Sequence, residues 1–266
     1  MTDLPPFDTS VPNTARIWNY WLGGKDNFAA DREAAEQVAK AMPTLPVIAR
    51  AVRRFLISGV YQLAADYGVT QFLDIGAGLP AADNTHQVAQ RVTPSSRIVY
   101  VDSDPMVISY ARALLTGSPE GTTDYIHADM RDTGTILAEA ARMLDFSQPV
   151  AILLLSVLHF FPADEDPWAI VAQLMDAVPS GSYLAIVHAA SDIQAEGEPE
   201  ARQRYNQMTP MQFTPRSYAE VARFFNGLEM ISPGLVPMSQ WGVSGAGAEA
   251  AAEASLAGYC GIGRKP

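Results

Sequence analysis

Three acidic residues of the sequence stand at nearly equal intervals, each at the end of a short apolar run. Asp74, Asp102 and Asp129 are 28 and 27 residues apart. Apolar runs that alternate with helical segments predict parallel strands, and the carboxyl ends of such strands meet at one edge of a sheet. A carboxylate there accepts hydrogen bonds from ribose hydroxyls or from an adenine amino group. We therefore expect a nucleoside site, to which the neighbouring Ser103 and Met130 also contribute.

A glycine turn follows the first of these acids and bears on which nucleoside binds. Gly76, Ala77 and Gly78 form a G-x-G turn, in which the glycines let the backbone approach a ligand closely. Ala81 completes the formal G-x-G-x-x-A pattern of dinucleotide sites. Asp74, two residues before the first glycine, would repel a pyrophosphate but attract the ammonium group of S-adenosylmethionine. The carboxylate therefore favours S-adenosylmethionine over NAD as the cofactor.

The segment after the fourth predicted strand would face the reacting end of that ligand. Ser156 and Val157 follow the strand, and we expect both to contact the cofactor. His159 lies two residues further on, and the ordinary pKa of a histidine is close enough to neutrality for a general base. A packed or hydrogen-bonded loop histidine is the alternative, and the sequence leaves both open.

The chain begins with a predicted helix whose two sides differ. Its apolar side would dock on the protein, while Arg16, Asn19 and Tyr20 lie on the opposite side of a helical wheel. If the helix packs across the carboxyl edge of the sheet, it forms a lid that excludes water from the reaction. We then expect these three residues to contact the cofactor, and Tyr20 to join His159 as a catalytic residue.

The turn after this helix is rich in glycine and polar residues. Lys25, Asp26 and Asn27 come directly after Gly23 and Gly24. They either bind the cofactor or the substrate, or they only cap the next helix. The sequence does not decide between these two roles.

The elements that would position these residues follow from hydrophobic periodicity. Strand-like runs alternate with helical segments between residues 71 and 188, which predicts a Rossmann-like, doubly wound α/β fold: a mostly parallel seven-stranded sheet with helices on both faces. Residues 1–70 would form the helical N-terminal lid and the first core helix, and residues 71–266 the core of one structural domain. The low-complexity segment 244–255 is predicted as a surface loop or short helix. Strands are predicted at 71–75, 97–101, 124–128, 150–155, 182–188, 228–232 and 257–263, and helices at 14–22, 28–41, 47–67, 84–91, 105–115, 133–143, 166–178, 195–207 and 216–225.

Composition excludes several classes of partner. The 266 residues carry 29 Asp and Glu against 18 Lys and Arg, a formal net charge of -11 that repels a phosphate backbone. One cysteine and no Cys/His cluster of zinc spacing predict no metal site. The apolar runs are too short to cross a bilayer, and the start lacks the pattern of a signal peptide. We expect a cytoplasmic protein that acts on a small molecule and binds neither nucleic acid nor membrane. The sequence is also compatible with a homodimer.

The glycine turn and the strand-end acids resemble those of class I S-adenosylmethionine-dependent methyltransferases. More narrowly, residues 16–33, with their Gly-Gly-Lys-Asp-Asn-Phe motif, look like the signature of an actinobacterial family of these enzymes. Residues 72–80, 99–105, 157–161, 181–188 and 222–228 also resemble that family, so the similarity spans nearly the whole chain. Ala77 departs from it, because a threonine is expected in the glycine turn. The resemblance implies methyl transfer from S-adenosylmethionine but supplies no acceptor.

Two other functions are compatible with these residues. A non-catalytic S-adenosylmethionine-binding protein would use the same glycine turn and strand-end acids without turning over a substrate. An NAD-linked oxidoreductase fits the formal glycine pattern and is opposed by Asp74. The methyltransferase is the function that the sequence favours.

Overall fold

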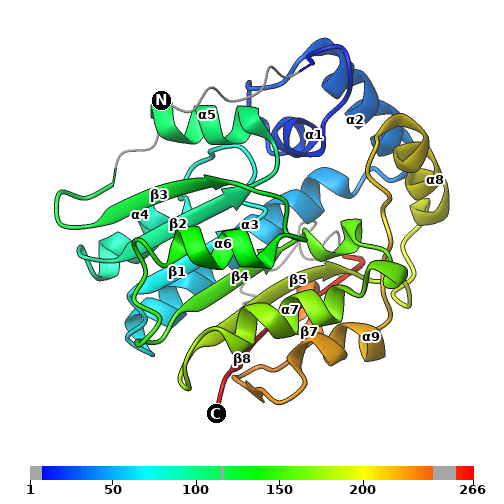
Figure 1. The fold of residues 1–266 in the computed structure, drawn as a ribbon. Coiled ribbons are helices and arrows are strands. Elements are labelled where there is room, and N and C mark those ends of the chain that lie inside the picture. The colour runs from blue at the N-terminus through cyan, green and yellow to red at the C-terminus, as the bar shows by residue number, and fades with distance from the viewer. Residues whose placement is uncertain (1–7, 115–116, 242–255) are drawn as a thin grey trace.

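The computed structural model describes residues 8–114, 117–241 and 256–266 (Figure 1). Its centre is an eight-stranded sheet with the order β3-β2-β1-β4-β5-β8-β6, in which β7 also pairs with β8. Strands β1 to β5 run parallel, whereas β8 runs antiparallel to β5, β6 and β7. The predicted doubly wound α/β fold is therefore confirmed. The strands are β1 Gln71–Ile75, β2 Arg97–Asp102, β3 Thr122–His127, β4 Ala151–Leu155, β5 Tyr183–Ala189, β6 Glu229–Met230, β7 Val236–Pro237 and β8 Gly258–Arg264.

Helices connect the parallel strands, and side chains at their first turns explain where several of them begin. The Asp104 carboxylate accepts the Met106 N–H at 2.8 Å, with Pro105 as the first helical residue, so the predicted start of α5 is confirmed. The described helices are α1 Thr14–Trp21, α2 Ala29–Ala41, α3 Leu45–Ala65, α4 Thr85–Val92, α5 Pro105–Leu114, α6 Thr133–Ala140, α7 Pro167–Asp176, α8 Glu198–Met208 and α9 Tyr218–Ala222, with short 3-10 turns η1 Leu158–Phe160, η2 Ala163–Glu165, η3 Arg223–Phe225 and η4 Met238–Gln240.

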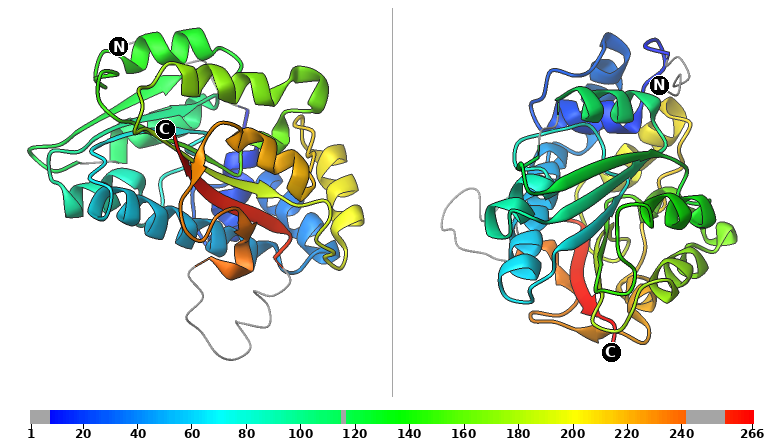
Figure 2. Two further views of the ribbon diagram at one scale, coloured as in Figure 1. Left: turned by 90° about the horizontal axis from the view of Figure 1, so that it is seen from below. Right: turned by 60° about the vertical axis from the view of Figure 1, so that its left-hand side comes forward.

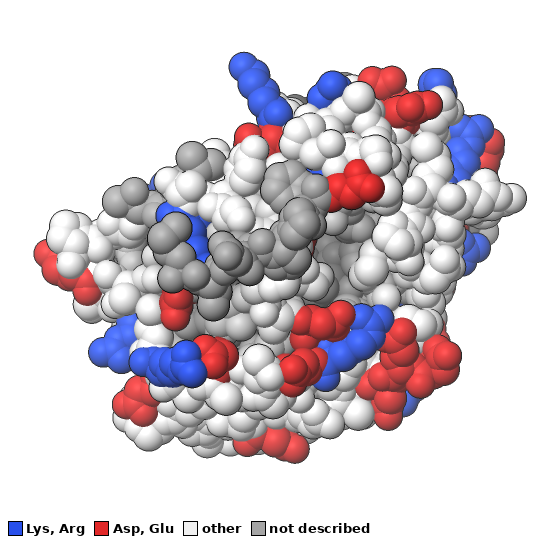
Figure 3. All heavy atoms as spheres, turned by 45° about the horizontal axis from the view of Figure 1, so that its top comes forward, with Lys and Arg blue, Asp and Glu red and all other residues white. Residues whose placement is uncertain are grey.

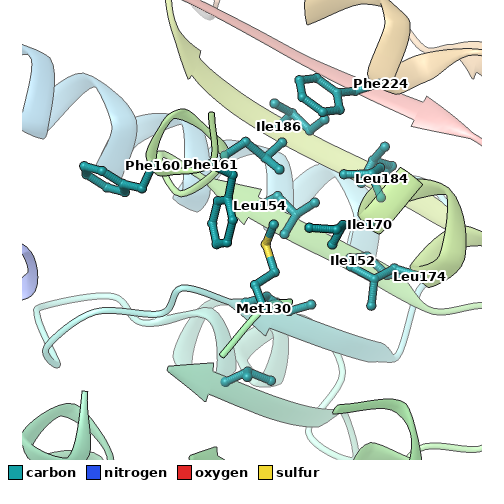
Figure 4. Packing of buried hydrophobic residues seen from close by; sticks show 14 of the residues in the cluster. Met130, Ile152, Leu154, Phe160, Phe161, Ile170, Leu174, Leu184, Ile186 and Phe224 are labelled. Atoms are coloured by element: carbon teal, nitrogen blue, oxygen red, sulfur yellow. The ribbon is translucent and has the colours of Figure 1, made fainter. Parts of the chain in front are cut away.

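The central strands are buried on both faces because helices cover each side of the sheet (Figures 1 and 2). Helices α3, α4 and α5 pack with residues such as Phe72 and Leu153 on one face. Helices α6 and α7 pack with Ile152 and Leu154 on the other face, and Figure 4 shows this second cluster from close by. Neighbouring residues of β4 thus enter different clusters, which explains why its sequence is apolar throughout rather than alternating.

A group of helices, which we call the helical cap (α1, α2 and α8), lies at the carboxyl edge of the sheet (Figure 1). The Thr14 and Tyr205 hydroxyls are 2.6 Å apart and join α1 to α8. Arg204 donates to the Gln37 carbonyl at 2.7 Å and joins α8 to α2. The cap therefore combines the N-terminal helices with a helix that is inserted after β5, far away in the sequence.

In the last third of the chain, the helix predicted at 195–207 and the strand predicted at 257–263 correspond to α8 and β8, but other elements differ from the prediction. The strand predicted at 228–232 contains only two ladder residues, Glu229–Met230, and β7 was not predicted. The helix predicted at 216–225 splits into α9 and η3. These elements are too short for a periodic pattern to develop, and β8 rather than their own sequence holds the two short strands in place. The predicted loop 244–255 lies outside the described residues.

Candidate functional site

The ends of β1 to β4 surround a hollow, which we call the acid-lined cavity. Segments from α1 and α3 close it from the side of the cap. Parallel strands place their carboxyl ends together, so the expectation that the strand-end acids share one crevice is met. The structure brings the following predicted site residues to this cavity: Asn19, Asp74, Gly76, Ala77, Gly78, Asp102, Ser103, Asp129, Met130, Ser156 and Val157.

The glycine turn has a backbone that other residues would adopt only with strain. Gly76 and Gly78 have φ angles of +77° and +65°. A Cβ on Gly76 would lie 2.7 Å from Val157 Cγ2, so the turn also packs against the segment after β4. The Gly78 N–H donates to Asp102 Oδ2 at 2.9 Å. The turn is therefore held open at the cavity by contacts with both neighbouring strands.

Asp102 combines a structural role with free acceptor capacity. Its second oxygen, Oδ1, accepts the Asp104 N–H at 2.9 Å. A carboxylate oxygen has two lone pairs, so each oxygen can still accept a hydrogen bond from a ligand in the cavity. Burial raises the pKa of Asp102 to about 6, and the backbone N–H groups of Asp104 and Gly78 oppose that rise. The charged form is thus costly without a ligand.

Asp74 lies deeper, with a side chain that is 5% exposed. Its Oδ2 accepts the Thr85 hydroxyl at 2.7 Å. Burial raises the pKa of Asp74 to about 6; the Thr85 bond and the Arg53 charge lower it, and the Asp102 charge raises it further. Two carboxylates with raised pKa values at one cavity form a site that a cationic ligand would stabilise.

The third strand end differs from the other two because its acid is exposed and already paired. Asp129 Oδ2 lies 2.9 Å from Arg131 Nη1, and Arg131 Nη2 lies 2.6 Å from Glu165 Oε2. The Arg131 guanidinium also lies over the Phe161 ring, 4.6 Å from its centroid. Met130, by contrast, is buried beside the cavity. Sequence reasoning missed Arg131, although its position two residues after Asp129 was a usable signal.

A second hollow, which we call the apolar cavity, lies between the cap, η1 and the end of β5. Its wall is made mainly of aliphatic and aromatic side chains. Five residues line both cavities, so the two hollows adjoin each other: Thr14, Trp18, Val52, Ser156 and Phe160. At this junction Ser156 has a φ of +63°, a left-handed conformation that costs a non-glycine residue energy and is often found at functional sites.

His159 is the predicted catalytic residue that lines the apolar cavity. Its side chain is 4% exposed and packs against Phe160, Phe213 and His188, with ring centroids 4.5, 4.6 and 5.6 Å away. Burial lowers the pKa of His159 well below its usual value, and the neighbouring charges of His188 and Arg216 lower it further. The imidazole is therefore neutral near pH 7, and its buried Nδ1 has no hydrogen-bond partner among the described residues.

His188, the neighbour of His159, is fully committed to the fold. Its Nδ1 lies 2.8 Å from the Ala189 carbonyl, and Arg216 Nη1 donates to its Nε2 at 3.0 Å. Arg216 is itself buried and donates to the carbonyls of Leu158 and Phe161. These bonds fix the η1 turn, and with it the position of His159.

Two predicted site residues lie outside both cavities. Arg16 is buried and its Nε lies 3.0 Å from the Asp31 carboxylate, which joins α1 to α2. The Tyr20 hydroxyl donates to Glu36 Oε1 at 2.9 Å on the exposed side of the cap. The helical wheel assigned Arg16 to a ligand-facing side because a wheel cannot reveal a buried ion pair. Instead Trp18, assigned to the docking side, reaches both cavities.

The glycine-containing turn after α1 has a structural role in this conformation. Asn19 Oδ1 accepts the Asp26 N–H at 3.1 Å and Asn27 Nδ2 at 2.9 Å. A Cβ on Gly24 would lie 2.4 Å from Asn19 Nδ2, which explains the glycine. Lys25, Asp26 and Asn27 are not among the residues that line either cavity.

Other kinds of site are not found in the described part of the chain. No described helix is long and apolar enough to cross a membrane. Among residues 8–114, 117–241 and 256–266, no cluster of three His, Cys, Asp or Glu side chains could hold a metal ion. On the face drawn in Figure 3, basic and acidic side chains are scattered among uncharged ones without forming a continuous basic band.

Comparison with known proteins gives a consistent result. The model of a family described as S-adenosyl methyltransferase matches residues 2–266. A crystal structure of a DUF574 family protein from Streptomyces avermitilis is 39% identical, with 97% of this chain and 99% of that chain covered and a TM-score of 0.93. A candidate methyltransferase from Thermobifida fusca is 37% identical, with 100% and 99% covered and a TM-score of 0.87.

More distant comparisons concern the fold alone. A plantazolicin methyltransferase, crystallised with a triazolic desmethylPZN analog and SAH, is 13% identical, with 95% of this chain and 96% of that chain covered and a TM-score of 0.50. At this identity the likeness supports only the Rossmann-like arrangement of strands and helices. No curated protein matches the sequence.

Proposed function

Because the chain belongs to the S-adenosyl methyltransferase family, with S-adenosylmethionine as its cofactor, we propose that it methylates a small-molecule acceptor. We also propose that the protein is cytoplasmic and has no nucleic-acid partner, since a net charge of -11 opposes binding to phosphate backbones.

We further propose that residues 16–33 are the signature of an actinobacterial branch of the family. The two similar proteins from Streptomyces and Thermobifida support this proposal.

The residues of the acid-lined cavity fit the parts of this cofactor. The free lone pairs of Asp102 suit two ribose hydroxyls, and the buried carboxylate of Asp74 suits the ammonium group, directly or through water. Asp129 and Met130 are the proposed contacts of the adenine ring. When bound, S-adenosylmethionine supplies an electrophilic methyl group whose C–S bond breaks, with the electron pair left on sulfur, as a nucleophile forms the new bond to carbon.

The contact between the two cavities is the observation that favours catalysis over binding alone. The apolar cavity adjoins the acid-lined cavity at the five residues that line both. A protein that only bound the cofactor would need the first cavity, whereas a transferase also needs an acceptor held beside it. The second cavity therefore favours an enzyme over the non-catalytic binding protein. Asp74 beside the glycine turn continues to oppose an NAD-linked oxidoreductase.

We propose that the N-terminal part of the chain acts as a lid on a core formed by residues 71–266. Thr14, Trp18 and Leu22 follow each other at four-residue spacing along α1 and its end, and all three reach the acid-lined cavity. Hydrogen exchange should slow in residues 14–30 when S-adenosylhomocysteine binds, because closure of the lid protects their amides. Exchange that is the same with and without this ligand would contradict the lid.

The cofactor site is tested by calorimetry on the full chain with S-adenosylhomocysteine in EDTA. We expect saturable binding at micromolar affinity that persists in the chelator, and no binding of NAD under the same conditions. A chromatographic assay for S-adenosylhomocysteine formation with candidate acceptors then tests transfer. Absence of calorimetric binding in a folded protein would exclude the proposed function.

A further inference from the structure

The apolar cavity contains few polar groups, and most of these already have partners. The hydroxyls of Thr14 and Tyr205 bond to each other, and both ring nitrogens of His188 are engaged. Glu198 and Arg202 pair with each other at 3.5 Å. The two charged side chains of the described lining are therefore joined in one ion pair, although the buried Glu198 Oε1 accepts no hydrogen bond.

His159 is the uncharged exception. Its Nδ1 is buried without a hydrogen-bond partner among the described residues. A buried polar atom without a partner is unfavourable, and an unpaired atom beside a hollow commonly has a ligand or water as its partner. Trp18 and Ser156 also carry polar atoms, but these two residues line both cavities and so lie at the junction. Among the described residues that line the apolar cavity alone, the buried polar atoms without a hydrogen-bond partner are thus His159 Nδ1 and Glu198 Oε1, and Glu198 already forms an ion pair with Arg202.

The walls also limit the shape and charge of an occupant. The cavity encloses about 810 Å³ of empty space when its open mouth and the solvent in it are included. Rings of Trp18, Trp21, Phe160, Tyr205 and Phe213 line it, which favours a flat, aromatic occupant. A charged occupant would lose its hydration without gaining a counterion.

We propose that the apolar cavity binds an uncharged aromatic acceptor, and that a hydroxyl group on its ring hydrogen-bonds to His159 and receives the methyl group. This inference rests on the proposed methyltransferase function and adds the substrate class. An aliphatic amine would arrive as a cation, for which this cavity has no unpaired carboxylate. A ring hydroxyl arrives neutral and matches a neutral imidazole nitrogen.

The proposed transfer to the ring hydroxyl conserves atoms and electrons. A lone pair of the acceptor oxygen forms the O–CH₃ bond, the C–S bond breaks, and its electrons stay on sulfur. The hydroxyl proton moves to His159 and then to water. The positive charge of the sulfonium thus reappears on the imidazolium, so the site as a whole gains no charge during the step. Burial beside Arg216 then favours release of that proton from His159.

The test uses four probes with one ring system and different substituents: 2-naphthol, naphthalene, 2-naphthoate and (2-naphthyl)methylamine. Binding to the full chain saturated with S-adenosylhomocysteine is followed by the fluorescence of tryptophan, since Trp18 and Trp21 line the cavity. We expect 2-naphthol to bind about five- to tenfold more tightly than naphthalene, the value of one hydrogen bond. The anionic and cationic probes should show no saturable binding.

Two variants locate the site. His159→Phe keeps a ring but removes both nitrogens, and should lower 2-naphthol affinity to that of naphthalene while leaving affinity for naphthalene and for S-adenosylhomocysteine unchanged. Ala201→Phe fills the cavity from α8 and should abolish binding of both uncharged probes. Gln203→Phe, which places the same ring at an exposed position of the same helix, is the control and should change nothing.

The outcomes separate this inference from the function on which it rests. If S-adenosylhomocysteine binds but the uncharged probes do not, or if the charged probes bind equally well, the acceptor class is wrong and the methyltransferase proposal stands. Equal effects of His159→Phe on 2-naphthol and naphthalene would exclude the hydrogen bond. If S-adenosylhomocysteine itself fails to bind, both proposals fail. Should Ala201→Phe not fold, the probe series and His159→Phe still decide the matter.

Discussion

The acid-lined cavity and the apolar cavity adjoin each other but are built in opposite ways. The first is formed mainly by the carboxyl ends of four neighbouring parallel strands and carries two carboxylates with raised pKa values, the buried Asp74 and the half-buried Asp102. The second is assembled from the helical cap, the η1 turn, the end of β5 and the start of β8, and within the described lining His159 is its one uncharged residue of its own with a buried, unpartnered polar atom. Under the proposed function, charge would select the occupant of the acid-lined cavity, and shape would select the occupant of the apolar cavity.

This difference implies a division of labour between the sheet and the cap. Strands β1 and β2 are hydrogen-bonded to a neighbouring strand on each side, which fixes Asp74 and Asp102 at the acid-lined cavity, the proposed cofactor site. The cap helices meet the sheet only through side chains and a few hydrogen bonds, so their packing can change from one acceptor to another. Substitutions should therefore separate cofactor binding from acceptor binding.

The largest expected effect is on the acid-lined cavity alone. Asp102→Ala removes the acceptor of two charge-assisted hydrogen bonds to ribose, each worth roughly 1.5–3 kcal/mol before non-additivity. We expect S-adenosylhomocysteine affinity in calorimetry to fall between about tenfold and a hundredfold. Asp66→Ala, which removes an exposed acid at the end of α3, is the matched control. Unchanged affinity in folded Asp102→Ala would mean that this carboxylate only holds the glycine turn.

The next effect concerns the charge of Asp74. Because its pKa is raised to about 6, lowering the pH from 7.5 to 5.0 neutralises this carboxylate and should weaken S-adenosylhomocysteine binding about tenfold. Asp102 titrates in the same range and adds to the decline. Asp74→Asn keeps an oxygen for the Thr85 hydroxyl but not the charge, so its binding should be weaker at pH 7.5 and less dependent on pH. A wild-type affinity that is equal at both pH values would contradict the charge attraction.

The same substitution should make the cofactor-free protein more stable. The folded chain binds the Asp74 proton more tightly than the unfolded chain, whose carboxyl has the ordinary pKa of 3.8. The contribution of Asp74 to the free energy of unfolding therefore falls as pH rises from about 4 to about 6, by up to ~3 kcal/mol. Asp74→Asn should recover part of this loss at pH 7.5 in urea denaturation. A less stable Asn variant would mean that burial of the charge is compensated within the fold.

The contrast between the cavities also explains what the sequence could predict. Asp74, Asp102 and Asp129 follow short strands at regular spacing, and the rule that parallel strands share a carboxyl edge brings them together without any knowledge of packing. The start of α5 was predictable for a similar reason, since Asp104 and Pro105 are local signals. Local pattern thus suffices wherever neighbouring strands supply the site.

The apolar cavity had no such signal. Tyr205, Phe213 and Met238 come from distant segments, and an apolar side chain in a cavity wall has the same sequence pattern as one in the core. The helical wheel misplaced Arg16 for a related reason. A polar residue on a wheel suggests an exposed or ligand-facing side, but a partner such as Asp31 allows it to be buried. Contacts between segments that are far apart in the sequence decide these positions, and no local pattern of a single sequence reveals such contacts.

A smaller effect is expected on the apolar cavity alone. Phe213→Leu removes a ring that packs 4.6 Å from His159 and lines the cavity, but keeps an apolar side chain. We expect about a fivefold loss of 2-naphthol affinity, the order of one aromatic contact, with S-adenosylhomocysteine affinity unchanged. Phe213→Leu should therefore weaken 2-naphthol binding alone, whereas Asp102→Ala should weaken S-adenosylhomocysteine binding alone. A parallel loss of affinity for both ligands would mean that the two cavities are not independent.

The smallest effect is expected at Tyr20, which the sequence assigned to catalysis and the structure places on the exposed side of the cap. Tyr20→Phe removes only the hydrogen bond to Glu36, an exposed contact worth a few tenths of a kcal/mol. Stability, S-adenosylhomocysteine affinity and 2-naphthol affinity should each change less than twofold. Closure of the lid offers the one route by which Tyr20 would reach the ligand, because α1 carries it. A tenfold loss of turnover in Tyr20→Phe, with binding intact, would therefore show that the cap moves between binding and reaction and would restore Tyr20 to the catalytic residues.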